Sequence, residues 1–180
     1  MFKELFDDGD LLGYISENLK DPWKGTPFEG YVYISPKQKG EFGERFVAKY
    51  FEAKGSNVKR AKSSTAGNDR IIDGHKTEIK FSIATRSKDG GVKKDSFIIN
   101  HVSMDKDWER LVFIGINRNE EDIRAIWFTK EDFIKNIESE EPLFAYQQGG
   151  KKIKNDDFIC TGNKVKMLLK SNWVKPTDKW

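Results

Sequence analysis

The stretch that decides the fold reads Asn68-Asp69-Arg70-Ile71-Ile72-Asp73-Gly74-His75-Lys76-Thr77-Glu78-Ile79-Lys80-Phe81-Ser82. Two short strand-like segments flank an Asp-Gly pair, which is typical of a β-hairpin with a two-residue turn. Side chains alternate between the faces of a strand, so Glu78 and Lys80 share one face while Ile79 and Phe81 share the other. Directly paired residues of a hairpin also share a face, which puts Asp69 on the side of Glu78. The pattern therefore predicts two carboxylates and a lysine on one side of a small sheet.

That grouping of side chains favours metal-assisted chemistry. Two neighbouring carboxylates repel each other unless a positive charge lies between them, and Mg²⁺ is bound through carboxylates, waters and phosphate oxygens. A lysine beside such an ion can orient or help deprotonate a water and can offset charge on a phosphate under attack. The alternative is an exposed hairpin with a cross-strand ion pair, worth less than ~1 kcal/mol.

The same residues resemble a known motif. Asn68-Asp69, eight further residues and then Glu78-Ile79-Lys80 are similar to the PD-(D/E)xK motif of the restriction-endonuclease-like nuclease superfamily. The resemblance implies that Asp69 and Glu78 bind Mg²⁺, that the Ile79 backbone carbonyl is a further ligand, and that Lys80 is the catalytic lysine. Asn68 departs from the pattern, which has proline at that position.

Two other acids are candidates for the same site. Asp73 has the same face parity as Asp69 and is a rival first acid, although the Asp-Gly turn accounts for it without catalysis. Glu44 lies in the segment 41–55, whose apolar residues recur at helical spacing up to Gly55. The resemblance implies a glutamate near the metal on the helix before the sheet, whereas a pair with a neighbouring lysine is the alternative for Glu44.

Basic residues are concentrated in two parts of the chain. Residues 54–94 hold eleven lysines and arginines against four acids, and residues 149–180 hold eight against three. Such segments suit contacts with a polyanion. The DNA-binding candidates are Lys62, Ser63, Ser64, Arg86, Lys88, Lys93, Lys94, Lys151, Lys152 and Lys154.

Length and composition limit the class of protein. The 180 residues, with 34% charged and 13% aromatic residues, fit one globular domain. A single cysteine, Cys160, cannot form an internal disulfide, and the apolar runs are too short for a signal peptide or membrane span. We therefore expect a cytoplasmic protein without a membrane partner.

The remaining segments complete an expected α/β (α+β) fold, a mixed central β-sheet flanked by helices. Strands are expected at 57–61, 111–116 and 123–128, a strand or the entry to a helix is expected at 97–102, and a capped helix is expected from 129. The resemblance covers about residues 37–137, which it implies to be the catalytic core of one domain, with an N-terminal arm at 1–36 and a basic C-terminal segment at 147–180. In the arm, a helix at 10–20 with its leucines and Ile15 inward and a strand or extended segment at 31–34 are expected.

The resemblance implies a function as well as a fold. The expected activity is Mg²⁺-dependent hydrolysis of double-stranded DNA by a Type II restriction endonuclease acting as a homodimer, with two sites related by two-fold symmetry. A Holliday junction resolvase or a DNA-repair nuclease of the same superfamily is an alternative. A DNA-binding module with a catalytically idle site is another.

Overall fold

The computed structural model describes residues 9–18, 20–61, 66–85, 87–88, 90–119, 122–147 and 157–180. Its centre is a six-stranded mixed sheet with the strand order β1-β2-β3-β5-β6-β9. The strands are β1 (Val58–Arg60), β2 (Arg70–Ile72), β3 (His75–Ile83), β5 (Arg110–Ile116), β6 (Ile123–Thr129) and β9 (Lys175–Pro176). β3 and β5 pair in parallel, and the other neighbours pair antiparallel. The predicted fold class, a mixed central sheet flanked by helices, is confirmed.

The hairpin between β2 and β3 has the predicted register. Ile72 pairs with His75, and Arg70 pairs with Thr77. The two turn residues, Asp73 and Gly74, both have positive φ angles of 49° and 89°, as a type I′ turn requires. The two-residue turn therefore fixes which residues of β3 lie opposite β2 and its extension.

Helix α3 (Pro36–Ala53) covers the face of the sheet that carries Phe81. The helix begins five residues before the predicted start, because Ser35 and Gln38 form a capping box and Pro36 occupies the first turn. Helix and strand approach closely at Gly43, where a Cβ atom would lie 2.5 Å from the Phe81 Cβ. Any larger residue at position 43 would therefore push α3 away from β3.

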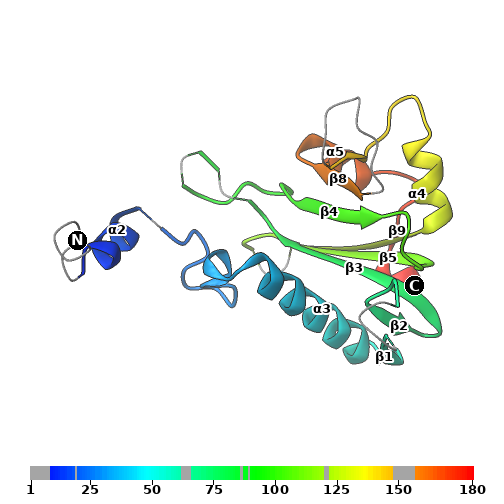
Figure 1. The fold of residues 1–180 in the computed structure, drawn as a ribbon, viewed down its shortest axis with the longest axis horizontal. Helices are drawn as coiled ribbons and strands as arrows, with labels where there is room; N and C mark the ends of the chain where they lie inside the picture. Colours follow the sequence, from blue (N-terminus) through cyan, green and yellow to red (C-terminus); the bar gives the residue numbers. More distant parts are fainter. Residues whose placement is uncertain are drawn as a thin grey trace, which may run out of the picture.

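The opposite face of β3 lies below a second sheet, which corrects the expectation of one sheet (Figure 1). This sheet has the order β4-β8-β7, formed by β4 (Ile98–Ser103), β8 (Asp157–Thr161) and β7 (Ala145–Tyr146). The predicted strand at 97–102 exists but pairs with β8, more than fifty residues away, and not with the central sheet. β4 shifts register between Ile99 and Val102, and His101 within this bulge has a positive φ of 51°.

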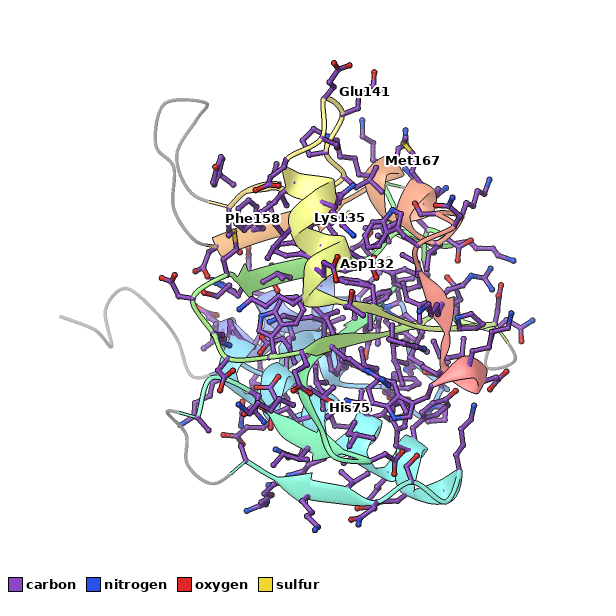
Figure 2. All side chains as sticks on the ribbon, turned by 90° about the vertical axis from the view of Figure 1, so that its right-hand side faces the viewer. His75, Asp132, Lys135, Glu141, Phe158 and Met167 are labelled. Carbon is purple, nitrogen blue, oxygen red and sulfur yellow. The ribbon has the colours of Figure 1, made fainter. Side chains whose placement is uncertain are left out.

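Two helices complete the layer above the central sheet. α4 (Lys130–Ile137) begins at the predicted capping box of Thr129 and Asp132, and α5 (Asn163–Leu168) follows β8. Figure 2 looks toward the end of the molecule that carries the β2–β3 turn, with His75 in the lower half and Phe158 of β8 in the upper half. α4, which carries Asp132 and Lys135, lies in front of the upper half. Phe158 is buried there against Phe133 of α4.

Two expectations for the arm are wrong. The helix α2 (Asp10–Asn18) forms, but Leu11, Leu12 and Ile15 are exposed, because α2 projects away from the sheets in Figure 1. Leu19, which was also expected to point inward, lies outside the described residues. Segment 31–34 is not a strand: Tyr31–Tyr33 form the 3₁₀ helix η1. The Asp21 carboxylate accepts hydrogen bonds from the backbone N–H groups of Trp23 and Gly30, which folds residues 21–30 into successive turns.

None of the helices in the described part of the chain is both long and apolar enough to cross a lipid bilayer.

Candidate functional site

Asp69 lies where the backbone pairing of β2 with β3 ends. Its N–H donates to the Thr77 carbonyl at 3.0 Å, and its Oδ2 accepts from the Ile79 N–H at 2.7 Å. The carboxylate thus makes the next hydrogen bond of the ladder in place of a backbone carbonyl. Since the N–H and C=O of one strand residue point toward the same side, the Ile79 carbonyl points to the edge where Asp69 lies.

Glu78 and Lys80 meet on the face of β3 that lies below the second sheet. The Lys80 Nζ is 2.8 Å from Glu78 Oε1 and donates to the His101 carbonyl of β4 at 2.8 Å. The Glu78 side chain has no exposed surface, and that of Lys80 is 14% exposed. The predicted shared face is therefore confirmed, and a bulge in the neighbouring sheet holds the lysine in place.

A second lysine, Lys106, also contacts Glu78 and was not predicted from the sequence. Its Nζ lies 3.1 Å from Oε1 and 3.4 Å from Oε2 of that carboxylate. The Lys106 carbonyl accepts from Lys130 Nζ at 2.6 Å. Close packing at Gly67, where a Cβ would lie 2.5 Å from the Asp107 backbone nitrogen, brings the loop of Lys106 against the Asp69 segment.

The charges around these groups are unevenly balanced. The pKa of Asp69 is raised to about 6, first by burial and then by the charge of Glu78, with a smaller effect from Glu44, and the hydrogen bond from Ile79 opposes this rise. Burial lowers the pKa of Lys106, but the attraction and hydrogen bond to Glu78, together with the charges of Asp69 and Asp157, outweigh burial and raise the pKa. Two ammonium groups thus lie next to Glu78 and offset its negative charge, whereas the negative charge of Asp69 is offset less.

Asp73, the rival first acid, lies at the opposite end of β2. Its Oδ1 accepts from the Asn57 N–H at 2.7 Å, and its Oδ2 accepts from the Trp180 Nε1 at 3.1 Å. These hydrogen bonds, that from Asn57 foremost, hold the pKa of Asp73 below its usual value. The structure therefore gives Asp73 a role in joining the turn to β1 and the C-terminus, away from Glu78.

Glu44 reaches the site from helix α3. Its Oε2 pairs with Arg70 Nη1 at 2.9 Å, and the same nitrogen donates to the Asp69 carbonyl at 2.7 Å. The partner of Glu44 is therefore an arginine of β2 and not the neighbouring lysine that was the alternative. Through Arg70, α3 is tied to the residue that carries the first carboxylate.

The basic candidates for DNA contact fall into two groups. Lys88 and Lys93 are exposed, and Lys94 forms an ion pair with Asp122 at 2.5 Å. The others lie outside the described residues: Lys62, Ser63, Ser64, Arg86, Lys151, Lys152 and Lys154.

The donor set suits a hard divalent cation. Among the described residues, no group of three or more histidine, cysteine, aspartate or glutamate side chains could hold a metal. A carboxylate pair with a backbone carbonyl nevertheless matches Mg²⁺, which keeps several waters and takes phosphate oxygens from its substrate. The raised pKa of Asp69 is the observation that fits best, because a cation would relieve its repulsion with Glu78.

Comparisons with known proteins leave the function to be argued from this geometry. No protein-family model matches the chain, and no curated protein matches its sequence. Among solved structures, the chain is similar to a bacterial homing endonuclease, I-Ssp6803I, with a TM-score of 0.42 and 14% identity. The match covers 68% of this chain and 84% of the other. A likeness at this level carries no argument about activity.

Proposed function

We propose that this protein is a Mg²⁺-dependent endonuclease that hydrolyses phosphodiester bonds in double-stranded DNA. The observation that carries the proposal is the meeting of Asp69, Glu78 and Lys80 at the end of the β2–β3 pairing, where Glu78 lies between two ammonium groups. An ordinary surface ion pair does not explain it, since the Glu78 carboxylate is fully buried.

Three oxygen donors would hold the ion: Asp69 Oδ1, an oxygen of Glu78 and the Ile79 carbonyl. Among the described residues, none donates a hydrogen bond to Asp69 Oδ1. When bound there, Mg²⁺ would supply charge neutralisation at the phosphate and lower the pKa of a coordinated water.

Lys80 would then act on the reacting groups. Its ammonium lies within hydrogen-bonding distance of Glu78, so it can orient a water beside the ligands and offset charge on the pentacovalent phosphate. The water oxygen forms the new bond to phosphorus as the bond to the 3′ oxygen breaks. The attacking water gives up one proton to solvent and the 3′ oxygen takes up one from solvent, which leaves a 3′-hydroxyl and a 5′-phosphate.

The remaining parts of the proposal concern the substrate and the assembly. Lys88 and Lys93 would contact the DNA backbone as exposed point charges. We further propose sequence-specific cleavage of the Type II restriction kind by a homodimer, since cutting both strands of a palindrome needs two sites related by two-fold symmetry. A cytoplasmic location belongs to the same proposal.

The test is digestion of a long duplex and of a four-way junction, each with Mg²⁺ or with EDTA. We expect discrete fragments from the duplex that are absent with EDTA. Lys80→Ala should lose the activity while keeping DNA affinity, and Lys76→Ala is the matched control, because Lys76 lies on the same strand but pairs with Asp107.

Each other result rejects a different part of the proposal. Cutting of the junction alone would replace restriction with a resolvase activity. Binding without cutting in Mg²⁺ would indicate an idle DNA-binding module, and cleavage that persists in Lys80→Ala would remove Lys80 from the mechanism.

A further inference from the structure

An open cavity of about 650 Å³ lies directly beside Lys80. One wall is the strand β3 from Ile79 onward with its neighbour β4, and the other is η1 with the first half of α3. Pockets that take small organic ligands have volumes of about 300–1,000 Å³. The cavity is thus large enough for one nucleotide and adjoins the proposed reaction site.

Aromatic side chains form the wall that faces β3. The Tyr31 ring packs edge-on against Phe81 and Phe42, with centroid distances of 5.9 and 5.6 Å, so the ring is held in place. Tyr33 also lines the cavity and is 51% exposed, whereas Trp23, a further lining residue, is buried in the core. No described residue hydrogen-bonds the Tyr31 hydroxyl. This wall offers flat rings and an available hydroxyl to a planar ligand.

Polar groups at the rim select the kind of planar ligand. Lys20 and Lys39 line the cavity and are the cations of its rim. Lys80 is already paired with Glu78, and the carboxylate of the cavity, Glu44, is paired with Arg70. Asn100 adds an amide that is exposed and makes no hydrogen bond to a described residue. Amides pair with the edges of nucleobases, and lysines bind phosphates.

We propose that this cavity, beside Lys80, binds one unpaired nucleobase of the DNA. The base stacks on the tyrosine wall, and its flanking phosphates lie against the rim lysines. This inference rests on the proposed function only in that the ligand is DNA. A base can reach the cavity from two sources, by extrusion from a duplex or from a nucleotide that is already unpaired.

Gly40 provides a way to fill the cavity without disturbing the core. The cavity-lining residues of α3 are Pro36, Lys39, Gly40, Gly43 and Glu44, which form a single stripe of the helix. A Cβ at Gly40 would meet no atom within 4 Å. Leucine is also a better helix former than glycine. Gly40→Leu should therefore fold and occupy the space of the base.

The experiment measures DNA affinity by fluorescence anisotropy in EDTA, so that cleavage plays no part. The probes are a perfect duplex, the same duplex with one bulged nucleotide, and the same bulge with an abasic site. We expect the wild type to bind the bulged nucleotide about tenfold more tightly than the abasic bulge, as base stacking on aromatic rings implies. Gly40→Leu and Tyr33→Ala should bring this ratio close to one.

Ala53→Leu is the matched control, because position 53 is exposed on the same helix and lies outside the cavity. It should keep the wild-type ratio. Equal affinity of the wild type for both bulges, or a ratio unchanged in both cavity variants, would overturn the inference. A rise in 2-aminopurine fluorescence within a bound perfect duplex would identify extrusion as the source, and a preference limited to bulges would identify the unpaired nucleotide.

The outcome is separable from that of the proposed function. Mg²⁺-dependent cleavage with no preference between the two bulges would leave the nuclease proposal standing and reject the base site. A base preference without cleavage in Mg²⁺ would do the reverse.

Discussion

The two ends of strand β2 each carry an aspartate, and the two carboxylates have opposite surroundings. Asp73, at the turn, accepts hydrogen bonds from Asn57 and Trp180, and its pKa is lowered. Asp69, at the other end, is half-buried near Glu78, and its pKa is raised to about 6. A carboxylate whose hydrogen bonds are supplied by the fold is structural, whereas a carboxylate whose charged form is disfavoured by the fold is a candidate for function. The comparison thus separates two residues that the sequence pattern alone leaves as rivals.

The largest expected effect is on DNA cleavage. Asp69→Asn should lower the Mg²⁺-dependent rate by about 10³-fold or more, because a neutral amide is a poor ligand for the ion that activates the water. The amide oxygen can still accept from the Ile79 N–H, so the hairpin should persist. Asp73→Asn is the control and should stay within about threefold of the wild-type rate, since Asp73 touches no group of the site. The rates are measured on one duplex substrate at several Mg²⁺ concentrations. A larger loss in Asp73→Asn would move the first ligand to the turn.

The second largest effect is on the free energy of unfolding. Substitutions at the two ends of β2 should change this free energy in opposite directions. Asp69 has a folded pKa near 6 against an ordinary 3.8, so ionisation destabilises the fold as pH rises through that window. In EDTA at pH 8, Asp69→Asn should therefore raise the free energy of unfolding by about 1–3 kcal/mol. The gain should largely disappear near pH 3.5, where Asp69 is protonated in the folded state and mostly protonated in the unfolded state.

The same measurement on Asp73→Asn should give the opposite result. Its folded pKa is lowered, so its stabilising contribution is present at neutral pH and is lost as pH falls below its ordinary value. Asp73→Asn should lower the free energy of unfolding at pH 8 by about 0.5–1 kcal/mol, a small value because the carboxylate is exposed. Chemical denaturation at pH 3.5, 5.5 and 8 measures both variants. Equal pH profiles for the two would contradict the contrast between the ends of β2.

The β2–β3 hairpin is predicted well from the sequence, because the residues that determine it are close together in the chain. The Asp73-Gly74 turn sets the register, and strand alternation then puts Glu78 and Lys80 on one face. The capping box at Thr129 is equally local and correctly starts α4. Each of these features depends on residues within about ten positions of one another.

Features that depend on distant contacts were missed. Lys106 lies between two aspartates in a loop that looks like a solvated turn, and only packing around Gly67 brings it to Glu78. β4 pairs with β8 across more than fifty residues, so its separation into a second sheet has no local signal. The side chain of Asp21 bends the arm by binding Gly30, which overrides the strand propensity of residues 31–34.

The smallest expected effect concerns metal affinity and compares two lysines, one near each end of the hairpin. Lys106 contacts Glu78, and Lys76 pairs with Asp107 near the turn end. Removing the Lys106 charge with Lys106→Met should tighten Mg²⁺ binding about threefold in the absence of DNA, because the ammonium and the ion compete for the same carboxylate. Lys76→Met should leave the affinity unchanged. Calorimetric titration of both variants with Mg²⁺ measures the difference. Weaker binding in Lys106→Met would show instead that Lys106 holds Glu78 in the position that the ion requires.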